Sequence, residues 1–135
     1  MIDTFYIIAK LCLAAIIGLV IGRERKRNDK PIGARTFAII CLSSCLLAII
    51  SLELSNRGYI FDFVRLISYS LPAIGFLGMG LIHKTSEGVE GLTTASTLFI
   101  LLPIGFSIGF GLFLYGIISS ILLYLLLESK NLFLK

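Results

Sequence analysis

The stretch LPAIGFLGMGLIHKTSEGVEGLTTAST, residues 71–97, decides the fold, because two apolar segments meet in it. It begins as an apolar run that contains Gly75, Gly78 and Gly80, and it then passes through a short polar link. Apolar sequence returns after Gly91, where hydroxyl residues follow closely. We interpret this stretch as the junction of two membrane segments, against which the rest of the chain packs or is anchored.

The composition is that of an integral membrane protein. Of the 135 residues, 57% are apolar and only 15% are charged, and the mean hydropathy is +0.99, far above the range of soluble domains. The charges gather in short clusters, which leaves no room for a second, soluble domain, so we expect one membrane domain over residues 1–135. The net charge of +4 is better explained by membrane topology than by nucleic-acid binding, because the sequence has no long basic stretch interleaved with aromatic residues.

Five apolar segments approach the roughly 20 residues that a spanning helix needs. They cover residues 4–22, 36–54, 66–82, 93–106 and 111–127. Residues 91–127 carry no charge and would extend about 55 Å as one helix, so they must turn back, near Pro103 and the glycines after it. The fold class predicted is therefore all-α and polytopic, with a fourth helix that is short or irregular. Lys10 is expected to reach the membrane interface with its long side chain.

The densest positive cluster is RERKRNDKPIGAR, residues 23–35, which Pro31 and Gly33 mark as a loop. The positive-inside rule places it in the cytoplasm. With five crossings the N-terminus is then outside and the C-terminus inside. The basic side chains are predicted to anchor this topology and to touch anionic lipid head groups: Arg23, Arg25, Lys26, Arg27 and Lys30.

Small residues recur at helical spacing in two of the segments. Gly18 and Gly22 lie four residues apart in the first, and Gly105 and Gly109 do so near the end of the uncharged run. Such stripes let helix backbones approach closely. We expect them to pack helices together, either within the chain or between copies in a homo-oligomer. The cysteines, all in apolar runs, are expected to be packing residues.

Four segments together resemble a known family. They are IGRERKRNDKPIGARTFAIICL (21–42), GFLGMGLIHK (75–84), GVEGLTTASTLF (88–99) and IGFSIGFGLFLYG (104–116). In one order they are similar to the membrane domain of the MgtC/SapB family. The positions that match its motifs are Ile21, Gly22, Glu24, Arg25, Pro31, Gly33, Arg35, Thr36, Gly75, Phe76, Leu77, Gly78, Gly80, Gly91, Leu92, Thr93, Thr94 and Ala95.

The resemblance implies a context for the function. The family is associated with bacterial growth at low magnesium and with survival inside host cells, and in some members with restraint of the membrane ATP synthase. Magnesium transport has been proposed for it. We expect this chain to be a short member that lacks the C-terminal cytoplasmic domain of many relatives. It departs from the pattern at Glu90, where many members carry a basic residue before the G-L-T-T motif.

Three carboxylates near one membrane face are candidate ligands for Mg²⁺, the one cofactor considered: Glu24, Glu87 and Glu90. The structural alternative for Glu24 is an ion pair with Arg35 that pins the ends of the first two helices. Solvated loop glutamates are the alternative for the other two. His83 is interpreted as a polar cap at the interface, or as a pH-sensitive gate or metal ligand.

The hydroxyls of Thr93, Thr94, Ser96 and Thr97 either cap a helix start and bond across helices, or line a small cavity opposite the glycines of the third helix. No catalytic constellation is found, so the protein is not expected to be an enzyme. The leading hypothesis is a protein of magnesium-limitation physiology that acts through contact with itself or another membrane protein. The alternative is a small oligomeric ion or solute transporter with a path along the third and fourth helices.

Overall fold

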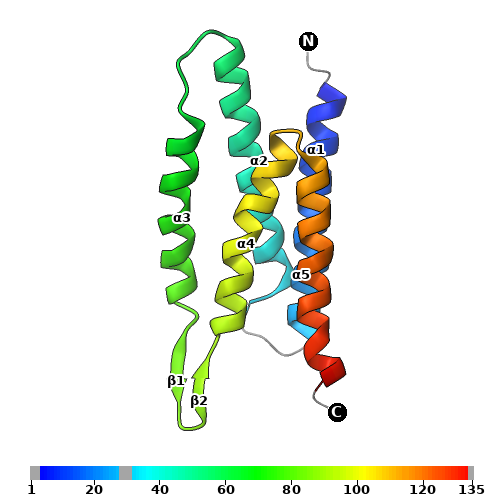
Figure 1. Cartoon of the computed structure of the whole chain (residues 1–135), viewed down its shortest axis with the longest axis vertical. Helices are drawn as coiled ribbons and strands as arrows, with labels where there is room; N and C mark the ends of the chain where they lie inside the picture. The colour runs from blue at the N-terminus through cyan, green and yellow to red at the C-terminus, as the bar shows by residue number, and fades with distance from the viewer. Residues whose placement is uncertain (1–3, 28–31, 134–135) are drawn as a thin grey trace.

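The computed structural model describes residues 4–27 and 32–133, and it places five helices and one short hairpin in them (Figure 1). The elements are α1 (Thr4–Arg27), α2 (Ala34–Asn56), α3 (Phe63–Met79), β1 (His83–Thr85), β2 (Gly88–Glu90), α4 (Leu92–Gly109) and α5 (Phe113–Phe133). By length and composition α1, α2 and α4 can each cross a membrane, and α3 and residues 113–129 of α5 are shorter apolar helices. The predicted all-α polytopic fold is confirmed.

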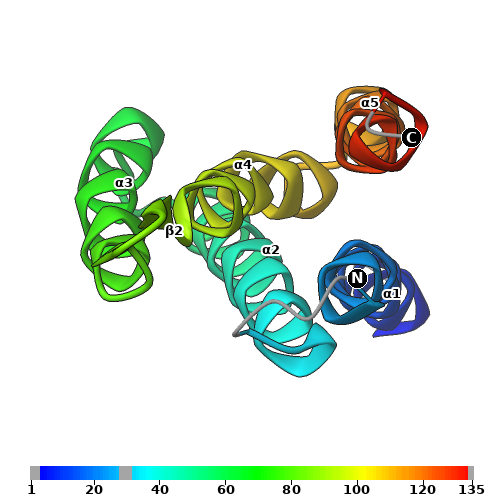
Figure 2. The same cartoon turned by 90° about the horizontal axis from the view of Figure 1, so that it is seen from below.

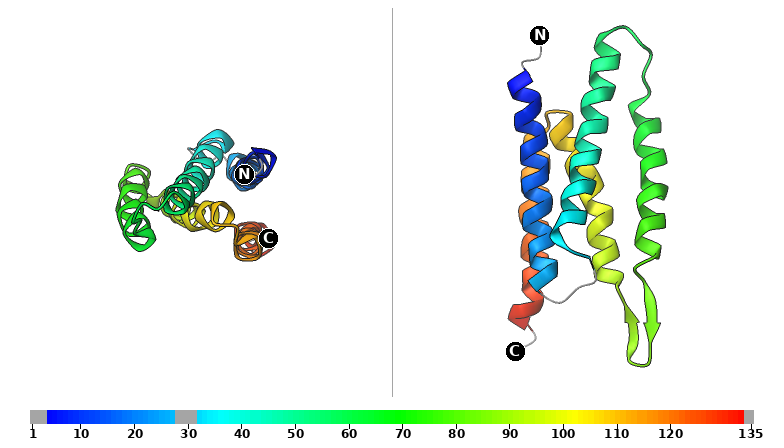
Figure 3. Two further views of the ribbon diagram at one scale, coloured as in Figure 1. Left: turned by 90° about the horizontal axis from the view of Figure 1, so that it is seen from above. Right: turned by 180° about the vertical axis from the view of Figure 1, so that it is seen from behind.

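Helix α4 is the centre of the molecule. It packs against each of the other four helices, and the end-on views show it between α3, α2 and α5 (Figures 2 and 3). More than half of its residues are buried. By contrast, α3 lies at the edge of the bundle, where only Ile74 and Gly78 are buried.

Glycines set the close crossings of α2 with its two neighbours. A Cβ added to Gly18 would lie 2.6 Å from the Cα of Ala38. On the other side of α2, a Cβ at Gly105 or Gly109 would overlap Ser44 or Ala48. Both predicted small-residue stripes therefore pack helices within the chain, and they give no support to a contact between copies.

Helix α1 continues beyond its predicted end at residue 22. Residues 23–27 are helical, so the prediction that the loop begins at residue 23 was wrong. Glutamate, arginine and lysine are good helix formers, and cations in the last turn interact favourably with the helix dipole. Lys30 and Pro31 lie outside the described residues.

Helix α4 is longer than predicted, with 18 residues or about 27 Å. It runs through Pro103 and ends at Gly109, so the predicted end at residue 106 was wrong. The turn back comes after Gly109, where Gly111 adopts φ +83°, a conformation that glycine takes without strain. Burial on several sides compensates for the short length, because a helix supported by neighbours does not need to face lipid along its whole surface.

The polar link after α3 is a β-hairpin, which the sequence did not predict. Strands β1 and β2 pair antiparallel, with His83 opposite Glu90 and Thr85 opposite Gly88. The hairpin lies at the same end of the molecule as the end of α1 and the end of α5, and the start of α1 lies at the other (Figure 1). We call the first of these the basic end. The arrangement agrees with the predicted odd number of crossings.

Candidate functional site

A buried lysine near the start of α1 joins this helix to the end of α4. Lys10 is only 7% exposed, and its Nζ donates a hydrogen bond to the carbonyl oxygen of Gly109 at 2.9 Å. The same Nζ lies 4.6 Å from the ring centroid of Tyr6. The last carbonyls of a helix carry partial negative charge, and an aromatic face attracts a cation. The ammonium is thus held by the C-terminal end of α4 rather than by a carboxylate.

Residues of α2 pack around this lysine. The thiol of Cys45 on α2 donates to the carbonyl oxygen of Lys10, with 3.7 Å between sulfur and oxygen. A hollow of about 460 Å³ opens beside the lysine, lined mainly by apolar residues together with Glu53 and Arg57. These two side chains form their own ion pair at 2.9 Å.

Sequence reasoning missed these contacts: it predicted only that Lys10 reaches the interface, whereas the structure buries the side chain against the end of α4. The available signal was a lone lysine inside an apolar run with Tyr6 four residues earlier, on the same helical face. An ionisable side chain inside a membrane segment is by default a candidate functional residue with a partner. What the sequence did not supply was the partner, because Gly109 is 99 residues away.

At the basic end, Glu24 and Arg25 form a buried ion pair. The Nε of Arg25 donates to Glu24 at 2.6 Å, and both residues are 3% exposed. Arg35, the partner proposed for Glu24, is exposed at the start of α2. Arg27 makes an ion pair with Glu128 of α5 at 2.6 Å, through both carboxylate oxygens. Arg25 is therefore a packing residue and is not placed to meet lipid head groups.

The three carboxylates considered for Mg²⁺ lie in different settings. Glu24 is buried in α1, whereas Glu87 and Glu90 are exposed on the hairpin. Glu90 lies 3.6 Å from the Nε2 of His83 across the strands. Among the residues that the structure describes, no three His, Cys, Asp or Glu side chains are grouped as a metal site. Binding of Mg²⁺ by these glutamates stays a prediction that the geometry does not support.

The hydroxyls at the start of α4 mostly bond within their own helix. Thr97 donates to the carbonyl oxygen of Thr93 at 2.7 Å, and Ser96 donates to that of Leu92 at 2.9 Å. Thr93 is exposed. Thr94 is buried, and its Oγ1 has no hydrogen-bond partner among the described residues. These hydroxyls therefore do not cap the helix start, where Gly91 is the N-cap without a side-chain bond.

A comparison with known protein families matches residues 11–135 to the MgtC family. The chain belongs to the MgtC family. It is 34% identical over 133 residues to Protein SapB of Bacillus subtilis, covering 92% of this chain and 55% of that protein. It is 35% identical over 128 residues to the Putative magnesium transporter YhiD of Escherichia coli K12, covering 90% and 59%. Protein MgtC of Salmonella typhimurium LT2 is 31% identical over 121 residues, 88% of this chain and 50% of that protein.

The chain thus spans about half the length of most of these relatives of the MgtC family. Their names describe a putative transporter and otherwise unspecified proteins, and none of the three names an enzyme. No solved structure matches the chain.

The geometry explains several glycines through which the chain resembles the MgtC family. Gly91 has φ +84°, and a Cβ there would overlap the carbonyl oxygen of Leu81. Only glycine fits this junction without strain. Gly78 faces Ala95 of α4, where an added Cβ would meet the alanine Cβ at 3.4 Å. Gly75 and Gly80 differ, because a Cβ at Gly75 would meet nothing within 4 Å and one at Gly80 only a backbone oxygen of its own helix.

Thr36 and Arg35 are both exposed in the first turn of α2. Their neighbour Ala34 packs against Gly22 of α1. A Cβ added to Gly22 would lie 2.6 Å from the Cα of Ala34. The first two helices therefore touch through backbone at the basic end. The charged side chains of this segment lie around that contact and do not form it.

Proposed function

We propose that this chain is a multi-pass protein of the bacterial inner membrane that supports growth at limiting magnesium by contacting another membrane protein, or a second copy, through α3. The MgtC family membership and the name of the YhiD relative, a putative magnesium transporter, support the magnesium context. The basic end faces the cytoplasm in this proposal, as the positive-inside rule requires.

The observation that carries the proposal is the loose attachment of α3. Its packing partner among the helices is α4, and it presents Val64, Tyr69 and Phe76 with about three quarters of their surfaces exposed. Its glycine at position 75 leaves open space at the helix surface. A glycine in a membrane helix commonly allows the backbone of a second helix to approach closely. Since no part of the described chain fills the space beside Gly75, a second protein is the natural occupant.

Site-specific photocrosslinking in native membranes tests this contact. A photoreactive phenylalanine analogue replaces Phe76 of α3, which is 73% exposed, and the control carries it at Leu114 of α5, which is 68% exposed. Cells are grown at limiting magnesium. We expect a discrete crosslinked product from position 76 and none from position 114. The proposal is overturned if position 76 gives only lipid adducts, or if the two positions give the same products.

The transporter alternative has one observation in its favour. A hollow of about 330 Å³ lies between α3 and α4, next to Gly75, Gly78 and Ser96. Its lining is otherwise mainly apolar, whereas an ion path needs polar groups to replace water. Purified protein in liposomes should pass Mg²⁺ if this reading is right, and Gly78→Leu should stop the flux. Equal Mg²⁺ flux in protein-free liposomes would rule out the transporter alternative.

A further inference from the structure

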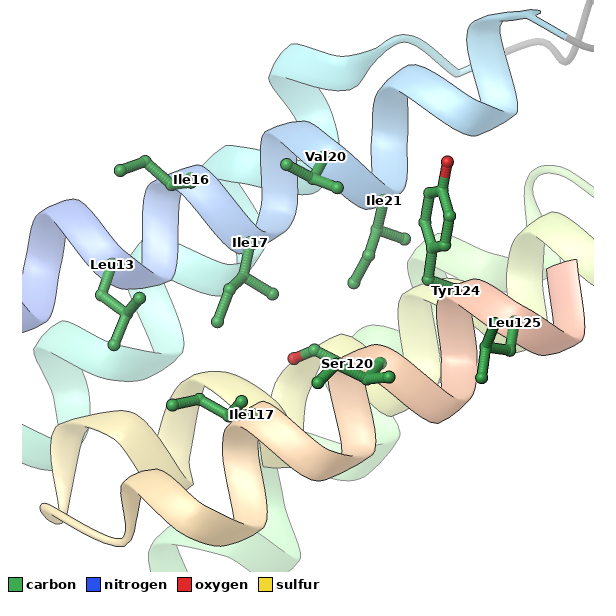
Figure 4. A pocket seen from close by; sticks show the side chains of 10 residues that line it. Leu13, Ile16, Ile17, Val20, Ile21, Ile117, Ser120, Tyr124 and Leu125 are labelled. Atoms are coloured by element: carbon green, nitrogen blue, oxygen red, sulfur yellow. The ribbon is translucent and has the colours of Figure 1, made fainter. Parts of the chain in front are cut away.

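Helices α1 and α5 touch near their two ends and separate between them. Near the start of α1, the rings of Tyr6 and Phe113 meet edge to face with centroids 6.1 Å apart. At the basic end, the ion pair of Arg27 with Glu128 joins the helices. Between these contacts lies a hollow of about 440 Å³ (Figure 4). We call it the α1–α5 groove, and Leu13, Ile17, Val20, Ile117 and Leu125 contribute to its walls.

The groove has an apolar lining. The polar residues of its lining are Ser120 and, at one end, Tyr124. The Ser120 hydroxyl donates to the carbonyl oxygen of Gly116 at 2.6 Å. The serine is thus already satisfied within α5. A polar ligand would lose its water here and gain no hydrogen bonds in return. The lining therefore selects hydrocarbon.

A second hollow, of about 660 Å³, continues the groove towards the basic end. It is lined by Arg23, Lys26, Arg27 and Glu24, together with Val20 and Tyr124, which also line the groove. Figure 4 shows Tyr124 rising from α5 towards α1 beside Ile21. The two hollows adjoin at this tyrosine, because it lines both of them. The apolar groove thus opens directly into a positively charged site.

The balance of charge in this second hollow favours an anion. Three cations face one carboxylate, Glu24, whose charge is already opposed by the buried Arg25. Arg27 shares its charge with Glu128. Arg23 and Lys26, both exposed on the last turns of α1, remain as the two cations that line the hollow without a role in these pairs. A phosphate at this position would meet charge of the opposite sign.

The length of the groove fits one leaflet of a bilayer. From Leu13 to Arg23 there are ten residues, or about 15 Å along the helix axis, which is half of the roughly 30 Å hydrocarbon core. A transmembrane helix of a partner would need a groove of full height, whereas the lining of this one begins only at Leu13 on α1 and Ile117 on α5. An acyl chain that hangs from a head group needs only the half that is present.

We propose that the α1–α5 groove binds an anionic phospholipid of the leaflet at the basic end. One acyl chain lies between the two helices, and the phosphate lies beside Arg23 and Lys26 with the Tyr124 hydroxyl at its side. The lipid fills the gap between α1 and α5 and so becomes part of the packed bundle. This site is independent of the α3 contact proposed above.

Native mass spectrometry of the purified protein tests the site. The protein is exposed to phosphatidylglycerol or phosphatidylcholine with identical acyl chains, and the retained lipid is counted. We expect preferential retention of phosphatidylglycerol. The double variant Arg23→Gln with Lys26→Gln should weaken it about thirty-fold, because each cation beside an anionic head group is worth about 1 kcal/mol and 1.4 kcal/mol is a factor of ten. The matched control, Arg35→Gln with Lys84→Gln, removes two exposed cations elsewhere at the basic end.

A second pair of variants tests the acyl chain. Leu125 lines the groove and is 58% exposed, whereas Leu122 on the same helix is 56% exposed and does not line it. Leu125→Trp should abolish retention, and Leu122→Trp should not. The proposal is overturned by equal retention of the two lipids, by an equal loss in the Arg35 and Lys84 control, or by retention in Leu125→Trp that matches Leu122→Trp. Loss of self-association in Leu125→Trp with unchanged lipid retention would assign the groove to a second copy and would also overturn it.

Discussion

The substitution of Gly18 by alanine tests the glycine-mediated crossing of α1 with α2. An added Cβ at Gly18 would lie 2.6 Å from the Cα of Ala38 and 2.7 Å from the carbonyl oxygen of Phe37. Both atoms belong to the backbone of α2, so no side-chain rotation relieves the overlap. The matched control is Gly75→Ala in α3, where the new methyl group meets nothing within 4 Å.

The magnitude follows from two opposing effects. Overpacking a well-packed crossing costs about 1–3 kcal/mol, while alanine in place of a helical glycine gains about 1 kcal/mol. Because the overlapped atoms belong to the backbone, the upper part of that cost applies, and Gly18→Ala should lower the free energy of unfolding by up to about 2 kcal/mol, which is an up to thirty-fold change in the unfolding equilibrium. Gly75→Ala has only the favourable effect and should be neutral or slightly stabilising.

The assay uses a cysteine that the same packing hides. Cys45 is fully buried in α2, so its alkylation reports on opening of the bundle. In a Cys12→Ser background, which removes the exposed thiol, labelling of Cys45 is followed by mass spectrometry during titration with a denaturing detergent. We expect Gly18→Ala to be labelled at lower detergent than its parent. If Gly18→Ala and Gly75→Ala respond alike, the close crossing described here is refuted.

Three further experiments probe other parts of the bundle, each by the same detergent titration. Gly91→Ala should destabilise by about 1–2 kcal/mol from the left-handed backbone alone, and an unchanged midpoint would contradict the φ of +84°. Lys10→Met should destabilise the protein by about 1–2 kcal/mol, because the Gly109 carbonyl loses a charged donor. A rise in stability would contradict this, because it would show that the lysine destabilises the fold. In a double-mutant cycle, Arg27→Gln and Glu128→Gln should couple by no more than about 1 kcal/mol, since Arg27 is 58% exposed; a larger coupling that resists salt would contradict this.

The sequence predicted the number of helices and their chemistry because these depend on local composition. A run of apolar residues long enough to cross the hydrocarbon has few alternatives to a helix. The small residues at positions 18, 22, 105 and 109 were likewise recognisable as crossing points from their spacing. Whether these stripes packed within the chain or between copies depended on which helices are neighbours, and no single helix carries that information.

The site was predicted less well for the same reason. A lysine side chain in an apolar helix can reach outwards to the interface or inwards to a helix end, and the choice for Lys10 was decided by the position of Gly109. The grouping of three glutamates assumed that residues at one membrane face are close together. The hairpin instead extends away from the helices (Figure 1), so Glu87 and Glu90 lie on an exposed projection while Glu24 is buried.

Growth at limiting magnesium is the most direct test of the claim that α3 carries the functional contact. Gly75→Trp fills the open space on α3, and Leu114→Trp places the same bulk on an exposed position of α5. Both variants are expressed to equal levels in a strain that lacks the native protein and depends on it. The account predicts that growth fails with Gly75→Trp and is normal with Leu114→Trp. Normal growth with Gly75→Trp would contradict it.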